Sequence, residues 1–243
     1  MSGLGLTIVK RNGEKTSFNP QKIMARIKKA AKGLKVNTDE ICLKVMTTIP
    51  YEGELETSRL DRQIAEISAA YTGSHYDYSK LAAMIMISSY HKETLSSFTE
   101  TMNTLNSDGV IHDDLIKKIE EYGAVKVDAI VDHERDYNFD FFAWRTLQEM
   151  YLSKDARGVA IERPQHMYLR VALWVTNSLK EAKEYYESLS KQLISPATPI
   201  MINAGTTVPQ LASCVLEYNT GDSGDGLLQT FADVARYSSS GAG

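Results

Sequence analysis

The stretch Pro196-Ala-Thr-Pro-Ile-Met-Ile-Asn-Ala-Gly205, continued by Pro209-Gln-Leu-Ala-Ser-Cys-Val-Leu216, organises the whole chain. Its prolines and Gly205 favour turns, and Cys214 lies on a short apolar run that predicts a strand. A turn followed by a thiol on a strand is one way to place a reactive group in a pocket. The alternative is a buried structural cysteine, because free cysteines are among the most buried residues. These residues alone therefore leave both roles for the thiol open.

The composition is that of a soluble globular protein with one large or two ordinary domains. The chain has 243 residues, of which 43% are hydrophobic and 24% are charged. Its net charge of −4 argues against a general nucleic-acid-binding protein. No apolar run is long enough to span a membrane, and the N-terminus does not resemble a secretory signal. The two cysteines, Cys42 and Cys214, are too few for a disulfide framework or a cysteine-based zinc site. We expect a cytoplasmic protein without nucleic-acid or membrane partners.

The first 95 residues predict a small β-hairpin with four helices. Leu6–Lys10 is β-prone, Asn12-Gly13 is a hairpin turn, and Glu14 to Phe18 can form the return strand. Asn19-Pro20 begins a strongly basic helix. The other three helices are expected from about Thr38 to Thr48, from Glu56 to Gly73, and from Asp77 with Leu105 as the furthest limit.

The hairpin tip and the start of the basic helix together predict a site for an anion. Lys10 and Arg11 lie at the tip, and the N–H groups of a helix N-terminus favour phosphate. The competing interpretation is a basic helix face that only contacts solvent.

Residues 108 to 195 predict mostly helices. Phe139 to Leu152 is rich in aromatic residues, which indicates core packing more often than a binding surface. Glu162-Arg-Pro-Gln-His166 is expected to precede a helix that includes Met167 to Val175, and another helix is expected from Leu179 to Leu193. His166 is interpreted as a local hydrogen-bonding residue rather than a catalytic one. The sequence contains no Walker A loop, no GxGxxG motif and no cluster with metal-ligand spacing.

Motifs along nearly the whole chain resemble the large, catalytic subunit of class I ribonucleoside-diphosphate reductase, nearest the eukaryotic type. The segments that carry the resemblance are Val9-Lys-Arg-Asn-Gly13, Phe18-Asn-Pro-Gln-Lys-Ile23, Leu60-Asp61, Leu81 to Thr94, Arg135-Asp-Tyr-Asn-Phe139, Glu162-Arg-Pro-Gln-His-Met167 and Pro196 to Leu216. The resemblance implies a mainly α fold with a small β part. It divides the chain into an ATP-cone activity domain (1–95), a helical domain (96–195) and the start of an incomplete ten-stranded α/β barrel (196–243).

The resemblance also implies roles for individual residues. Cys214 is the redox-active cysteine, and its partner cysteine lies outside this chain; Thr198 and Ser213 contact the substrate. The allosteric specificity site begins at Asp222, Ser223 and Gly224. The allosteric activity site, which binds ATP or dATP, is implied to contain Lys10, Thr16, Ser17, Phe18, Asn19, Pro20, Gln21, Lys22, Thr57, Asp61 and Lys92. Ser239 departs from the family pattern, which often has Lys or Arg near the specificity site.

The implied function is reduction of ribonucleoside diphosphates to deoxyribonucleoside diphosphates for DNA synthesis. The effectors would be ATP, dATP and other dNTPs, with Mg²⁺ accompanying the nucleotide, and no metal would be held by this chain's own residues. The implied partners are the C-terminal part of the large subunit, the small subunit with its di-metal radical cofactor, further large subunits, and thioredoxin or glutaredoxin.

The radical-bearing cysteine of the family is absent from this sequence. The chain is therefore expected to be inactive alone, as a split or truncated subunit. Two alternatives are a free-standing ATP/dATP-sensing module without catalysis and a helical protein with no nucleotide site.

Overall fold

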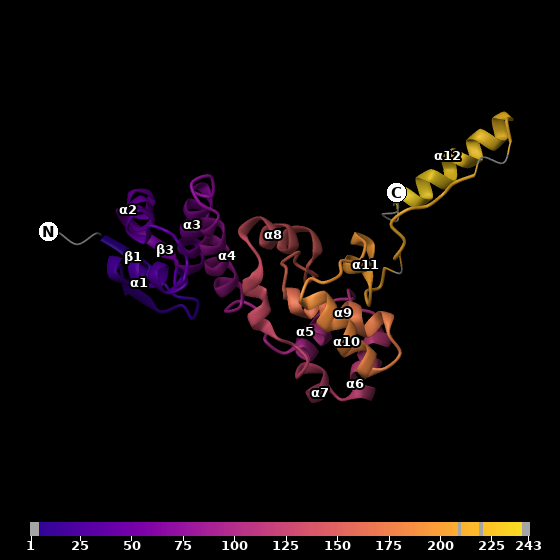
Figure 1. The fold of residues 1–243 in the computed structure, drawn as a ribbon, viewed down its shortest axis with the longest axis horizontal. Helices are drawn as coiled ribbons and strands as arrows, with labels where there is room; N and C mark the ends of the chain where they lie inside the picture. The colour runs from indigo at the N-terminus through magenta and orange to yellow at the C-terminus, as the bar shows by residue number, and fades with distance from the viewer. Residues whose placement is uncertain (1–4, 209, 219–220, 240–243) are drawn as a thin grey trace. The chain divides into compact units, whose positions relative to one another are not determined.

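A computed structural model describes residues 5–208, 210–218 and 221–239 of the chain (Figure 1). The described residues are mainly helical and include one three-stranded sheet. They divide into two compact units. The first comprises the described residues up to Thr94 together with Asp136–Leu147, and the second comprises Leu95–Arg135 and the described residues from Gln148 onward.

The sheet of the first unit has the strand order β2-β1-β3. Strands β1 (Gly5–Val9) and β2 (Lys15–Ser17) form the antiparallel hairpin that the sequence predicts, and Gly13 has the positive φ of 82° that its turn requires. Strand β3 (Glu52–Glu56) pairs in parallel with β1 and was not predicted. Only Leu55 of β3 is buried, so the strand lacks the alternation of apolar and polar residues that would reveal it.

Four helices complete the body of this unit. They are α1 (Pro20–Ala30), α2 (Thr38–Thr48), α3 (Thr57–Ala70) and α4 (Asp77–Tyr90). The side chain of Asn19 accepts a hydrogen bond from the Gln21 amide at 2.9 Å, which confirms the predicted start of the basic helix. Buried residues of the sheet and helices, such as Leu6, Ile27 and Ile64, form one hydrophobic core.

A late segment of the chain also belongs to this unit. Helix α8 (Phe141–Thr146) packs against α4 (Figure 1), and the ring of its buried Trp144 meets the edge of Tyr90 with centroids 5.1 Å apart. The prediction that the aromatic segment is core is only partly correct, because the Phe142 side chain in the same helix is 80% exposed.

One long helix from Asp77 to Leu105 is not formed. Helix α4 ends at Tyr90, and α5 (Phe98–Ser107) begins after Ser97, whose hydroxyl accepts from the Glu100 amide at 3.1 Å. A capped N-terminus satisfies backbone donors that a continuous helix would have bonded internally. The cap at Ser97 therefore accounts for the separate start of α5.

The second unit is helical. Besides α5 it contains α6 (Asp113–Tyr122), α7 (Ala124–Asp128), α9 (Pro164–Val175), α10 (Leu179–Ser190), α11 (Thr198–Asn203) and α12 (Gly224–Ser239). The 3-10 helix η1 (His133–Asn138) and the π-helix η2 (Leu147–Tyr151) lie where the chain passes between the units. Residues Pro164–Leu173 of α9 are buried, so this helix is the core element, and α10 packs against it.

The strand expected around Cys214 is absent from the described residues. Helix α11 occupies the first part of the stretch, and residues 210–218 have no regular structure. A strand requires a neighbouring strand to receive its hydrogen bonds, and no described residue pairs with this segment. Pro209 lies outside the described residues.

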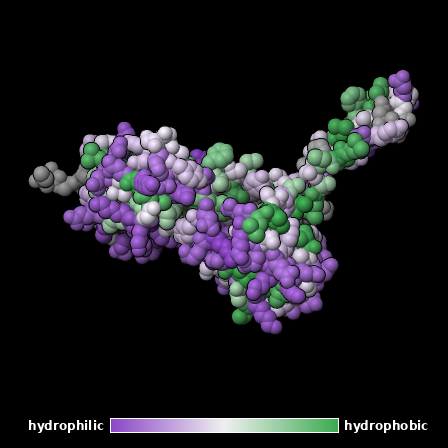
Figure 2. Space-filling model, in the orientation of Figure 1, coloured by the Kyte–Doolittle hydropathy of each residue, from purple (hydrophilic) through white to green (hydrophobic). Residues whose placement is uncertain are grey.

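Helix α12 presents hydrophobic side chains to solvent (Figure 2), including Phe231 at 70% exposure. A span of membrane thickness would need a longer and more apolar helix than any in the described ranges.

Candidate functional site

The first unit contains a pocket of about 200 Å³ between the hairpin, α1, the start of α3 and the chain that follows α4. It brings together most of the residues that the sequence analysis assigned to the activity site: Lys10, Thr16, Ser17, Phe18, Asn19, Lys22, Thr57, Asp61 and Lys92. Pro20 and Gln21 are exposed and do not line it.

The pocket is also lined by Arg11, which the sequence analysis placed at the predicted anion site but not in the activity site. The other lining residues were assigned to neither site: Ile8, Ile23, Arg26, Leu60 and Ile64. The aliphatic members belong to the hydrophobic core of the unit, so the inner wall of the pocket is apolar. Arg26 is one helical turn after Lys22 on α1, and this spacing is the signal in the sequence that could have identified it.

Positive charge exceeds negative charge in this pocket. Its cations are Lys10, Arg11, Lys22, Arg26 and Lys92, and Asp61 is its acid. Burial lowers the pKa of the Lys92 ammonium, and the nearby Arg26 and Arg11 lower it further, while Asp61 acts in the opposite direction. A lysine whose charge is disfavoured by its surroundings gains a counter-charge when an anion binds.

A larger hollow of about 680 Å³ adjoins the pocket and shares Lys10, Arg11, Thr57 and Lys92 with it. The hollow also includes Ser58 and Arg62, from the first two turns of α3. The N-cap residue of α3 makes no side-chain capping bond, so the first N–H groups of the helix are available to a ligand. Cations beside such N–H groups form a favourable environment for phosphate.

The structure does not bring together the residues assigned to the substrate site around Cys214. The Thr198 hydroxyl, at the start of α11, lies 3.0 Å from the Tyr151 hydroxyl. Ser213 and Cys214 are exposed, and the Ser213 hydroxyl lies 3.8 Å from the Cys214 sulfur. No hydrogen bond between described residues joins Thr198 to Ser213 or Cys214.

A buried ion pair contacts the C-terminal end of α11. Arg170 donates to both carboxylate oxygens of Glu162, at 2.7 and 3.1 Å, and both side chains are fully buried. Arg170 also donates to the backbone carbonyls of Met201, Ile202 and Ala204, at the end of α11. The Arg170 side chain therefore determines where this short helix lies within the second unit.

Residues assigned to the specificity site lie at the start of α12. Gly224 is the first residue of the helix, and the Ser223 hydroxyl accepts from the Gly226 amide at 3.1 Å. Asp222 is exposed. This arrangement caps the helix, and a role for these residues toward an effector stays a prediction.

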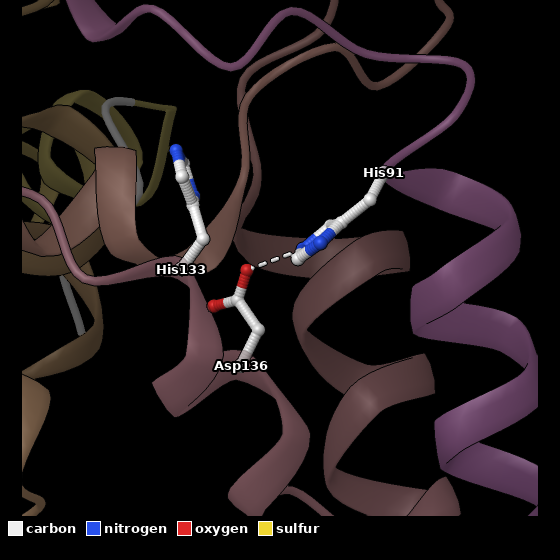
Figure 3. Close-up of side chains that lie close together, drawn as sticks. All are labelled: His91, His133 and Asp136. Carbon is white, nitrogen blue, oxygen red and sulfur yellow. Dashed lines mark hydrogen bonds and ion pairs between the residues drawn. The ribbon is translucent and has the colours of Figure 1, made fainter. Parts of the chain in front are cut away.

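Two histidines have structural contacts. The His91 ring, at the end of α4, is hydrogen-bonded to the buried Asp136 carboxylate at 2.7 Å (Figure 3), a contact within the first unit. His166 is buried in α9, and its ring lies against that of Phe98 with centroids 5.7 Å apart. These contacts are typical of interior histidines.

Comparison with known proteins finds two family models that match parts of the chain. Residues 6–93 match the family model of the ATP cone domain, and residues 137–209 match that of the all-alpha domain of ribonucleotide reductase.

Over 97% of its length the chain is similar to proteins named ribonucleoside-diphosphate reductase large subunit. It is 35% identical to the one from Arabidopsis thaliana, covering 30% of that protein, and 35% identical to the one from Dictyostelium discoideum, covering 28%. It is 37% identical to the one from monkeypox virus, covering 32%. The chain thus spans about a third of the length of the curated relatives it matches. It belongs to the ribonucleotide reductase large-subunit family and corresponds to the N-terminal portion, with an ATP cone followed by the all-alpha domain.

Proposed function

We propose that the first unit binds a nucleoside triphosphate, ATP or dATP, as a regulatory ligand. The observation that carries the proposal is a pocket with an apolar inner wall that adjoins a basic hollow across shared cations. A purine and its sugar match the first environment, and a chain of phosphates matches the second. The match of residues 6–93 to the ATP cone supports the adenine nucleotide over other ligands of this shape.

The charges at the boundary between the two hollows give the proposal its chemical detail. Lys10 and Lys92 line both, so either ammonium can contact phosphate oxygens while the base remains against Ile8 and Leu60. The N–H groups at the start of α3 add further donors. Because these groups are already fixed in the backbone, binding through them does not require a long side chain to be ordered. Mg²⁺ would arrive with the nucleotide.

Calorimetric titration of the 243-residue chain with ATP and dATP tests this part of the proposal. Hydrogen bonds to charged groups contribute about 1.5–3 kcal/mol, so Lys10→Gln and Lys92→Gln should each weaken binding about tenfold or more. Lys126→Gln, which removes an exposed lysine of the second unit, is the control and should bind like the wild type. A folded chain that binds neither nucleotide at millimolar concentration would exclude the proposal.

We further propose that the chain acts as the N-terminal part of a ribonucleoside-diphosphate reductase large subunit. Cys214 and a second cysteine outside this chain would each give one electron as their thiols close to a disulfide. The two electrons and two protons reduce the ribose 2′-carbon, and its hydroxyl leaves as water. The exposure of Cys214 supports this role over that of a structural cysteine, since the thiol is accessible for exchange.

Thr198 and Ser213 are proposed to contact the substrate, and Asp222, Ser223 and Gly224 to begin the specificity site. The activity would also need the C-terminal part of the large subunit, the radical-generating small subunit and thioredoxin or glutaredoxin.

Reconstitution tests the catalytic part. The chain would be mixed with a complementary C-terminal part and a small subunit, and reduction of a ribonucleoside diphosphate would be measured. Cys214→Ser should abolish turnover, and Cys42→Ser, at a buried position in the first unit, should retain it. Full activity of Cys214→Ser would refute the redox role. Nucleotide binding without any reconstituted turnover would instead favour a free-standing nucleotide sensor.

A further inference from the structure

The carboxylate of Asp61 lines the pocket, and the Asp61 side chain is only 6% exposed. Arg26 holds it with two hydrogen bonds: Nε donates to Oδ1, and Nη2 donates to Oδ2 at 2.9 Å. The same Nη2 lies 3.4 Å from the carbonyl of Ile85 in α4. Arg26 therefore joins the Asp61 carboxylate, on α3, to the backbone of a second helix, so the carboxylate cannot rotate without breaking these bonds.

The second arginine near Asp61 is engaged elsewhere. Arg11 Nη2 is 3.6 Å from Asp61 Oδ2, which is beyond hydrogen-bond distance. The Arg11 guanidinium instead donates to the Ser89 hydroxyl at 2.5 Å and to the Glu93 carboxylate at 3.0 Å. The orientation of Asp61 thus depends on Arg26.

We propose that Arg26 is a positioning residue for nucleotide recognition, which acts on the ligand through the Asp61 carboxylate. This inference rests on the proposed nucleotide-binding function of the first unit. Each carboxylate oxygen can accept two hydrogen bonds, and Arg26 uses one on each. The remaining acceptor positions are fixed in direction, and they accept from a ribose hydroxyl or an exocyclic amine of the ligand.

The sign of the charge determines which part of the ligand lies here. A fixed carboxylate repels phosphate and attracts hydrogen-bond donors, so the part of the pocket beside Asp61 takes the nucleoside. The phosphates are then directed to the adjoining basic hollow. Through Asp61, Arg26 contributes to the orientation of the nucleotide as well as to its affinity.

Lys22 offers a matched comparison. It lies on the same helix and lines the same pocket, but it makes no bond to Asp61. Lys22→Gln and Arg26→Gln each remove one positive charge from the pocket. If Arg26 contributed only charge, Asp61→Asn would change the loss of ATP affinity caused by Arg26→Gln no more than it changes the loss caused by Lys22→Gln.

The test is a double-mutant cycle on ATP affinity, measured by calorimetry with the full chain. Arg26→Gln should weaken binding about tenfold, the loss of a charge-assisted bond. In an Asp61→Asn background the same substitution should change affinity by less than about twofold, because the carboxylate it positions is gone. Lys22→Gln should weaken binding by similar factors in both backgrounds.

Arg26→Lys keeps the charge but cannot make the bidentate contact. Arg26→Lys should weaken ATP binding when Asp61 is present and have no effect in the Asp61→Asn background. It replaces Arg26→Gln in the double-mutant cycle if that variant does not fold. Equal losses with and without the Asp61 carboxylate, for either Arg26 variant, would overturn the inference. Failure of the wild-type chain to bind ATP would instead refute the proposed function itself, so the two failures are distinguishable.

Discussion

Removal of Arg170 from the buried pair should strongly destabilise the second unit. The Arg170 and Glu162 side chains are both fully buried and make two hydrogen bonds to each other, and Arg170 also bonds the carbonyls at the end of α11. Arg170→Met places an uncharged, apolar side chain at this buried position and removes the positive charge that Arg170 supplies to the Glu162 carboxylate. Such a change typically costs about 3–5 kcal/mol, a large fraction of the roughly 5–15 kcal/mol that stabilises a domain.

The assay is urea unfolding followed by tryptophan fluorescence in a Trp144→Phe background. The chain has two tryptophans, and Trp174 belongs to the second unit, so it then reports on that unit alone. With an m-value of about 2 kcal/mol/M, the expected loss lowers the midpoint by roughly 1.5–2.5 M urea.

Two further variants make the result interpretable. Glu162→Gln combined with Arg170→Met should cost less than the sum of the single changes, because no unpaired charge remains. Lys117→Met removes an exposed ion pair with Asp114 and should leave the midpoint unchanged. A loss below about 1 kcal/mol for Arg170→Met, or strict additivity in the double variant, would refute the reasoning.

Three other predictions follow from separate features. Gly205→Ala should cost about 1–2 kcal/mol in urea unfolding, because Gly205 has a φ of 79° and a Cβ there would meet two side chains at 3.1 Å; Gly158→Ala, with the same φ but open space, should cost less. A thiol reagent should modify Cys214 rapidly and Cys42 slowly, because Cys214 is exposed while burial raises the pKa of the Cys42 thiol. The Cys214→Ser chain retains only Cys42, and modification of that chain as fast as of the wild type would contradict this. ATP affinity should decrease as pH rises, and the decrease should begin at a pH lower than about 10.4, the ordinary pKa of lysine, because burial lowers the pKa of the Lys92 ammonium and its charge is lost earlier. Lys92→Arg, which stays charged, should remove this decrease.

Local signals in the sequence predicted much of the first unit. The Asn12-Gly13 turn and the Asn19-Pro20 helix start are decided by neighbouring backbone groups, and both features are present in the structure. Strand β3 and the packing of α8 on α4 were missed, because each depends on residues distant in the sequence. The predicted strand at Cys214 was wrong for the described residues, since a strand depends on a partner that a local apolar run does not reveal.

The candidate site shows the same division. The hairpin tip with Lys10 and the helix start at Asn19 predicted an anion site, and both line the pocket. The bonds between Arg26 and Asp61 join residues 35 positions apart, and no spacing rule pairs them. In the sequence, Arg26 is one more basic residue on a basic helix.

By itself, the sequence determined the elements with a local cause: the hairpin, the capped helices, the excess of positive charge on α1 and the family resemblance carried by short motifs. The tertiary structure alone decided which charges meet. It enclosed Asp61 beside Arg26, buried Arg170 with Glu162 and left Cys214 exposed. The physical reason is that a buried charge needs a counter-charge at bonding distance, and packing of elements distant in the sequence sets that distance.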